Sequence, residues 1–123
     1  MRDAGGGIAT QNYTVNETSK KEISEEISER LVRNCLDYII LKAVKNKALS
    51  GYEIMSFVHR KFGILLSAGT IYSILYSLER KDLVRATFNQ KARCYSLTEK
   101  GEATLSVILD MHSEMKALAE SIF

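Results

Sequence analysis

The chain has 123 residues, of which 46% are hydrophobic and 26% are charged. This length and balance predict a folded protein of about one domain, and they exclude a disordered or fibrous chain. No run approaches the roughly 18 apolar residues that a membrane-spanning helix requires. Because the first residues also lack the apolar stretch of a secretory signal, we expect a cytoplasmic protein.

Charge is distributed unevenly along the chain, although the formal net charge is only +2. Residues 50–101 contain eight lysines and arginines against four acidic residues, whereas residues 102–123 contain one lysine against four acidic residues. A positive middle segment is typical of a region that meets a polyanion. The distribution therefore favours a nucleic acid as the partner of residues 50–101.

The N-terminal part of the chain changes character near residue 18. Residues 1–17 are rich in glycine and polar residues, show no periodicity and predict a flexible arm. Ser19 and Glu22 then have the spacing of a capping box, which marks the start of a helix. The pattern that follows predicts either one long helix or two abutting helices, ending near Asn46.

Two further helices are predicted in the middle of the chain. Ser50 and Glu53 form a second candidate capping box, and the helix after them is expected to end at Gly63. Ser67 is expected to cap the next helix, which reaches about Lys81. Their predicted inward faces are Ile54, Val58 and Phe62 in the first helix and Ile71, Ile74, Leu75 and Leu78 in the second.

The pattern then becomes that of strands. The runs LVRATF (83–88) and RCYSL (93–97) predict a β-hairpin with its tip at 89–91. Helical periodicity returns towards the C-terminus. The order helix, helix, helix, hairpin, helix predicts a mainly α fold, an α+β winged helix-turn-helix in which the hairpin is the wing. We divide the chain into an arm (1–17), a winged helix-turn-helix domain with an N-terminal helical extension (18–101) and a C-terminal dimerisation helix (102–123).

The outer face of the helix at 68–81 is unusual, because it carries glycine, serine and tyrosine where a solvated helix would carry glutamate and lysine. In a winged helix the second helix of the pair lies in the DNA major groove. Small residues let the backbone approach, and hydroxyls can bond base edges or phosphates. This face therefore predicts DNA contacts at Ser67, Gly69, Thr70, Tyr72, Ser73 and Tyr76. The alternative for the tyrosines is packing beneath the hairpin or against another subunit.

Lys91 and Arg93 lie near the predicted hairpin tip. On their own they would indicate only a solvated turn. Their place beside the helix makes them candidates for phosphate contacts.

Three segments together resemble the signature blocks of PadR-type transcriptional regulators. They are SGYEI (50–54), SAGTIYSILYSLERKDLV (67–84) and RCYSLTEKG (93–101). The resemblance covers roughly residues 34–105 and implies a homodimeric winged-helix repressor of the short subgroup. It places Ser50 and Tyr52 in the first DNA-facing block and the 69–72 block on the second DNA-facing helix. It also implies that any small-molecule inducer, of unknown chemistry, would sit between the C-terminal helices and the first helix.

An apolar seam in the C-terminal segment predicts the contact between two copies of the chain. We expect a homodimer with its two-fold axis near this segment, bound to double-stranded DNA as its second partner. The predicted interface consists of Leu105, Ile108, His112, Met115, Ala119 and Ile122, completed by Ile23 and Ile27 of the first helix.

Catalysis is the first alternative class. His59 lies among basic residues, His112 lies in the seam, and the sequence shows no carboxylate pair, phosphate loop or nucleophile elbow. Cys35 and Cys94 have no metal-binding spacing and are interpreted as reduced structural thiols. We therefore expect no enzyme activity, no cofactor and no metal site. The second alternative is a winged-helix module that binds protein, although such modules usually lack a basic wing.

Overall fold

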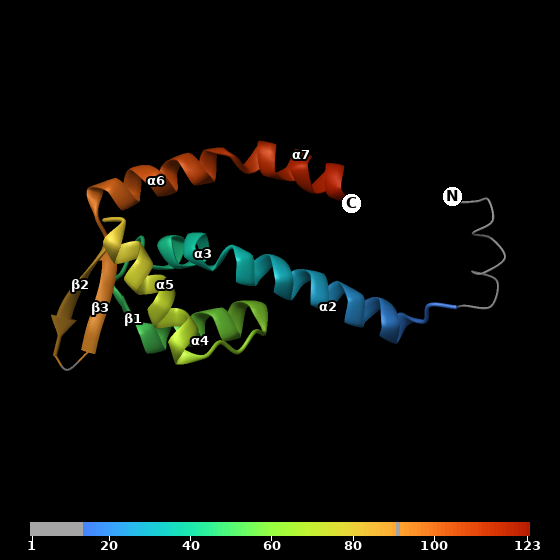
Figure 1. Cartoon of the computed structure of the whole chain (residues 1–123), viewed down its shortest axis with the longest axis horizontal. Helices are drawn as coiled ribbons and strands as arrows, with labels where there is room; N and C mark the ends of the chain where they lie inside the picture. The colour runs from blue at the N-terminus through green and yellow to red at the C-terminus, as the bar shows by residue number, and fades with distance from the viewer. Residues whose placement is uncertain (1–13, 91) are drawn as a thin grey trace. The chain divides into compact units, whose positions relative to one another are not determined.

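The computed structural model describes residues 14–90 and 92–123. The chain divides into two compact units, residues 1–31 and 32–123. The mainly α fold is confirmed, and the predicted helices and hairpin occur in the expected order, with one added strand and a divided C-terminal helix (Figure 1). The elements are α2 (Glu17–Asn34), α3 (Leu36–Ala43), β1 (Leu49–Ser50), α4 (Gly51–Phe62), α5 (Ala68–Arg80), β2 (Val84–Asn89), β3 (Ala92–Leu97), α6 (Glu99–Asp110) and α7 (His112–Ile122).

The first unit contains most of α2. The predicted cap at Ser19 is wrong, because the helix begins earlier and the Ser19 N–H donates to Oδ1 of Asn16 at 2.8 Å. Asparagine accepts from the first turn as well as serine does, so two overlapping start signals compete here. Residues 1–13 of the predicted arm lie outside the described residues. Of the two alternatives for the segment ending near Asn46, two abutting helices is confirmed, with the break at Cys35.

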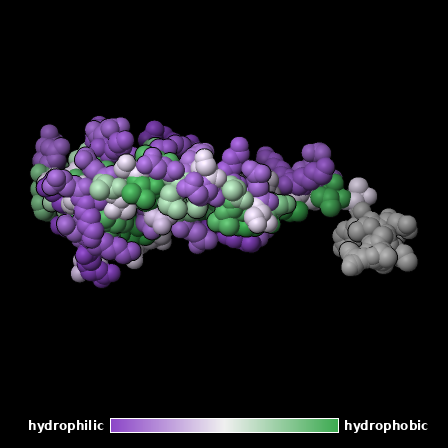
Figure 2. All heavy atoms as spheres, turned by 90° about the horizontal axis from the view of Figure 1, so that it is seen from above, coloured by the Kyte–Doolittle hydropathy of each residue, from purple (hydrophilic) through white to green (hydrophobic). Residues whose placement is uncertain are grey.

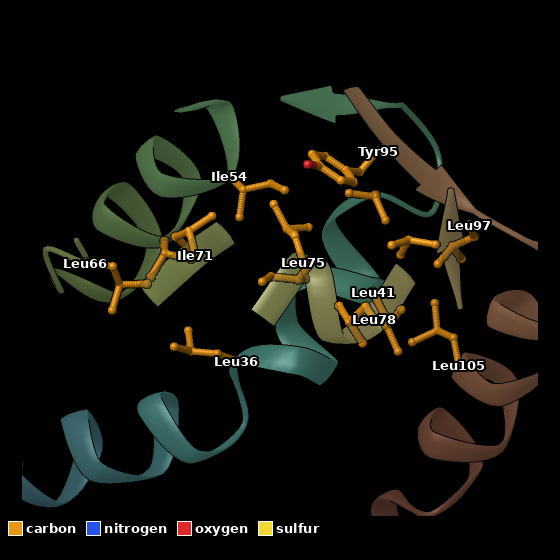
Figure 3. Packing of buried hydrophobic residues seen from close by; sticks show 14 of the residues in the cluster. Leu36, Leu41, Ile54, Leu66, Ile71, Leu75, Leu78, Tyr95, Leu97 and Leu105 are labelled. Atoms are coloured by element: carbon orange, nitrogen blue, oxygen red, sulfur yellow. The ribbon is translucent and has the colours of Figure 1, made fainter. Parts of the chain in front are cut away.

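The second unit is built around one apolar core (Figure 3). Leu75 of α5 lies at its centre, between side chains of α4, the sheet and α3. The predicted inward stripe of α5 is confirmed, with Ile74 only partly buried at its edge. Phe62 is the exception in α4, because its ring is exposed at the end of the helix. The fully buried side chains at the centre are Ile40, Leu41, Val44, Ile54, Val58, Ile71 and Leu75.

The helix ends in the middle of the chain follow the predicted local signals. Ser50 Oγ accepts from the Glu53 N–H at 3.1 Å, while a Glu53 carboxylate oxygen accepts from the Ser50 N–H at 3.0 Å. This hydrogen bond to the Ser50 backbone lowers the pKa of Glu53. Gly63 ends α4 with a φ of 71°, in the left-handed region that glycine adopts without strain.

A Schellman motif ends α5 and turns the chain into the sheet. The Leu83 N–H donates to the Leu78 carbonyl at 3.0 Å, and the Asp82 N–H donates to the Glu79 carbonyl at 2.9 Å. Asp82 has a φ of 61°, the left-handed conformation that the motif requires. After this turn the chain enters β2, which packs against α5.

The three strands form an antiparallel sheet in the order β1-β3-β2. Asn89 pairs with Ala92, so the hairpin is tighter than the predicted 89–91 tip, and Gln90 takes a φ of 60° in the turn. The short strand β1 was not predicted from the sequence. Its two residues, Leu49 and Ser50, pair with Tyr95 and Cys94 of β3 and tie the start of α4 to the sheet.

The C-terminal segment forms two helices that meet at Met111, where a single helix was predicted. Gly101 anchors α6, because a side chain at this position would collide with the backbone carbonyl of Leu83. Leu105 lies in the core of its own chain and is only 2% exposed. In contrast, α7 contributes no buried residue.

We expect Gly101→Ala to destabilise the protein by about 1 to 3 kcal/mol, because the added methyl group forces α6 away from the Leu83 carbonyl. Gly69→Ala is the matched control, since a Cβ there meets only Ser67 Oγ at 3.9 Å. Alanine should stabilise α5 at this position by about 0.5 to 1 kcal/mol. Urea unfolding followed by circular dichroism measures both, and equal effects in the two variants would contradict this account.

Candidate nucleic-acid interface

The outer face of α5 presents small and hydroxyl-bearing residues to solvent. Ser67 Oγ accepts from the Thr70 N–H at 3.1 Å and lies 2.9 Å from the Thr70 hydroxyl, so both side chains are engaged in capping. Gly69 and Ser73 are exposed. Of the six residues predicted on this face, four therefore remain available for contacts to a ligand: Gly69, Tyr72, Ser73 and Tyr76.

Tyr72 lies across the beginning of α4. A Cβ on Gly51 would approach the Tyr72 ring and hydroxyl to 2.6 Å, so the missing side chain makes room for the tyrosine. The ring is nevertheless 45% exposed. It packs on α4, and the alternative of packing beneath the hairpin or against another subunit stays a prediction. Tyr52 stands exposed one residue further along α4, so the two tyrosines come from adjoining helices.

Tyr76 lies one turn further along α5 and is 61% exposed. The Arg80 guanidinium carbon lies 4.8 Å from the centre of its ring, a cation–π contact that holds a positive charge on the same face. Arg80 is basic and exposed, but it was not singled out as a site residue from the sequence. Its position at i+4 from Tyr76 is the signal that could have identified it.

One side of this face is hollowed. A cavity of about 260 Å³ is lined by Ser73 and Ser77 of α5, by Lys81, and by Arg33 and Asp37 near the start of α3. The two serines therefore lie on the side of α5 that is next to α3, whereas Tyr72 lies on the side next to α4. The exposed surface of α5 lies between these two neighbours.

Arg93, a predicted phosphate contact, has partners within the chain. Its Nη2 donates to both carboxylate oxygens of Glu79, at 3.1 and 3.0 Å, and its Nε donates to the Tyr95 hydroxyl at 3.1 Å. The hydrogen bonds to Tyr95 and then to Glu79 raise the pKa of Arg93. Lys91, the other predicted wing contact, lies outside the described residues. Arg85, exposed on β2, is a further basic residue of the hairpin.

The residues predicted for the dimer interface fall into three groups. Ile23 is exposed and Ile27 half-buried in the first unit. Leu105 belongs to the core of its own chain, so it has almost no surface to offer a second copy. The other predicted residues, half-buried in one case and otherwise exposed, are Ile108, His112, Met115, Ala119 and Ile122.

The described residues offer no other obvious chemistry. Among residues 14–90 and 92–123, no cluster of three histidine, cysteine or acidic side chains is arranged to hold a metal ion. Cys35 and Cys94 are both free thiols, the first exposed and the second buried. Within the same ranges, no helix combines the length and the apolarity that crossing a bilayer requires.

A helix pair followed directly by an antiparallel hairpin defines the winged helix-turn-helix class of proteins. The sequence profile of the Transcriptional regulator PadR-like family matches residues 40–107, more than half of the chain. The chain belongs to this family, as the three sequence blocks suggested.

The chain is also similar to individual proteins in sequence or in fold. An uncharacterized protein of Lysinibacillus sphaericus is 27% identical over 73% of this chain and 89% of its own length. A PadR-like transcriptional regulator from Bacillus cereus superposes with a TM-score of 0.67 at 19% identity, covering 76% of this chain and 95% of that one. Bacillus subtilis PadR, solved in complex with operator DNA, is 28% identical with a TM-score of 0.52, and the match covers 60% of this chain and 46% of that one.

The two faces of α5 should respond differently to truncation. Leu75→Ala should cost about 2 to 5 kcal/mol of unfolding free energy, because it leaves a cavity at the centre of the core. Tyr76→Ala should change stability by less than about 0.5 kcal/mol, because its ring is mostly in solvent. Tyr72→Phe keeps the ring on Gly51 and should behave like Tyr76→Ala in thermal and urea unfolding. A large loss in Tyr76→Ala would place that ring in the core instead.

Proposed function

We propose that this protein is a sequence-specific DNA-binding repressor that acts as a homodimer on a near-palindromic operator. The observation that carries the proposal is the exposed face of α5, where Gly69, Tyr72, Ser73 and Tyr76 stand clear of the core. A helix of this kind fits the major groove, because its small residues permit close approach and its hydroxyls can bond bases and phosphates.

Charge and family support the same function. Arg80 lies in the last turn of α5, Lys81 caps it and Arg85 follows on β2, and these exposed basic side chains suit contacts to phosphates. The operator complex of Bacillus subtilis PadR is further support, since the present chain belongs to the same family. Phosphate contacts supply affinity in this arrangement, and α5 supplies the choice of sequence.

The homodimer is proposed from the surface of α6 and α7. Apolar side chains recur on α7 at helical spacing, and Leu118 is 52% exposed among them. Figure 2, seen from the side on which α6 and α7 lie in Figure 1, shows hydrophobic atoms exposed along this surface. Leaving such a stripe in water is unfavourable, and a second copy of the chain offers a matching stripe. The stripe consists of Met115, Leu118, Ala119 and Ile122.

DNA binding is tested by selecting bound duplexes from a random-sequence library and titrating the selected duplex. We expect an enriched near-palindrome, and an affinity for random duplex that falls steeply with salt. Tyr76→Ala and Tyr72→Phe should each lose about 1 to 3 kcal/mol of affinity for the selected duplex while remaining folded. No enrichment and no salt-dependent binding would favour the alternative, a winged-helix module that binds protein.

Assembly is tested by placing a charge in the apolar stripe. Leu118→Glu should convert the dimer to a folded monomer, because burying a carboxylate between two copies is strongly unfavourable. Ser113→Glu introduces the same charge on the opposite side of α7 and should remain dimeric. Light scattering gives the mass of each variant. A wild-type monomer, or a dimeric Leu118→Glu variant, would contradict the proposed interface.

A further inference from the structure

Arg93 connects three parts of the second unit. It stands on β3 of the wing, which is the hairpin of β2 and β3, and its guanidinium reaches Glu79 in the last turn of α5. The same guanidinium donates to the hydroxyl of Tyr95, a residue of the apolar core that is only 3% exposed. The wing, the helix with the exposed tyrosines and the core are thus joined through one side chain.

The geometry of this contact is close and directional. Both oxygens of the Glu79 carboxylate accept from Nη2, and a separate nitrogen, Nε, serves Tyr95. Charged hydrogen bonds of this kind are stronger than neutral ones. The Glu79 side chain is 26% exposed and the Arg93 side chain is 45% exposed, so the pair is partly shielded from water. Two of the three guanidinium nitrogens, Nε and Nη2, are therefore engaged within the chain.

Beyond Cys94, which is buried and paired with β1, the described side chains at the outer end of the wing are exposed. Val84 at the base of β2 is buried, and the Schellman turn holds that end. Further out, Thr87, Phe88 and Asn89 are all exposed. A two-stranded ribbon without a packed face bends readily. The Arg93–Glu79 pair therefore lies at the point where a contact can limit the motion of the ribbon relative to α5.

We propose that Arg93 is a positioning residue rather than a phosphate contact, and that its pair with Glu79 fixes the wing relative to α5. This replaces the role that the sequence predicted for Arg93. Its consequence for DNA rests on the proposed function: a wing held at one angle lets the wing and α5 engage one duplex together. The pair then increases the preference for operator over random DNA. Binding to random DNA does not require the wing to be held at one angle.

The acidic partner provides the decisive variant. If Arg93 only neutralised phosphate, Glu79→Ala would free it and strengthen binding to all DNA. If the pair positions the wing, Glu79→Ala and Arg93→Ala should both lower the ratio of affinities for selected and random duplex, by about three- to tenfold each. The double variant should be no worse than either single variant, since the same contact is lost once. The slope of log affinity against log salt should stay unchanged in Arg93→Ala.

A measurement without DNA tests the positioning itself. Amide hydrogen exchange in β2 and β3 should be about three- to tenfold faster in Arg93→Ala and in Glu79→Ala. Arg85→Ala is the matched control for this measurement, because it removes an exposed arginine from the same hairpin and should leave the exchange rates unchanged.

The proposal is overturned if Arg93→Ala flattens the salt slope by about 0.9, the loss of one phosphate contact, while wing exchange stays at the wild-type rate. Tighter binding of both duplexes by Glu79→Ala would overturn it equally. Because the exchange experiment contains no DNA, a protein that fails to bind any duplex would refute the proposed function and still leave the positioning role to be decided by exchange.

Discussion

Burial of the apolar stripe of α5 is the interaction on which the rest of the structure depends. Ile71, Leu75 and Leu78 enter the core between α3, α4 and the sheet, and each is at most 2% exposed. A helix with one stripe fixed in a core has no freedom to rotate about its axis. The opposite face is therefore presented to solvent, whatever residues it carries. Tyr76 and Ser73 owe their exposure to these three buried side chains.

Two close approaches of the backbone add to this arrangement. Gly51 makes room for the Tyr72 ring, and Gly101 lets α6 pack on the Leu83 carbonyl. The first links the beginning of α4 to the outer face of α5, and the second fixes the start of α6 beside the chain that leaves α5. Gly101 faces a backbone carbonyl that cannot retreat without disturbing the core, whereas Gly51 faces the outer end of the Tyr72 side chain on the proposed DNA surface.

The basic residues near the hairpin differ in their surroundings. Some lie on the exposed face of α5, and others pair with residues of the second unit. The sequence suggested phosphate contact for Lys91 and Arg93 and assigned no such role to Arg80. Arg80 stacks on Tyr76 at the exposed face, whereas Arg93 is paired with Glu79 and Tyr95. The two arginines thus make different contacts, although their side chains are identical. Their neighbours in space, which come from another element in the case of Arg93, make the difference.

Local signals are what the sequence by itself determined. The capping box at Ser50, the caps at Ser67 and Gly63, and the period of the α5 stripe depend on residues within one or two turns, so they could be predicted along with the order of elements. The start of α2 was missed because Asn16 and Ser19 both make good caps, and β1 was missed because two residues show no period.

Contacts between distant residues were decided by the tertiary structure alone. Leu105 and Met115 both belong to the C-terminal apolar repeat, yet Leu105 is buried in its own chain and Met115 is exposed, because α6 packs on α3 whereas α7 contributes no buried residue. Glu79 and Arg93 are 14 residues apart, and their pairing depends on the turn that brings the hairpin back to α5. Periodicity shows that a side chain is apolar and on which side of its helix it lies. Which surface, if any, covers that side is set by the packing of the whole chain.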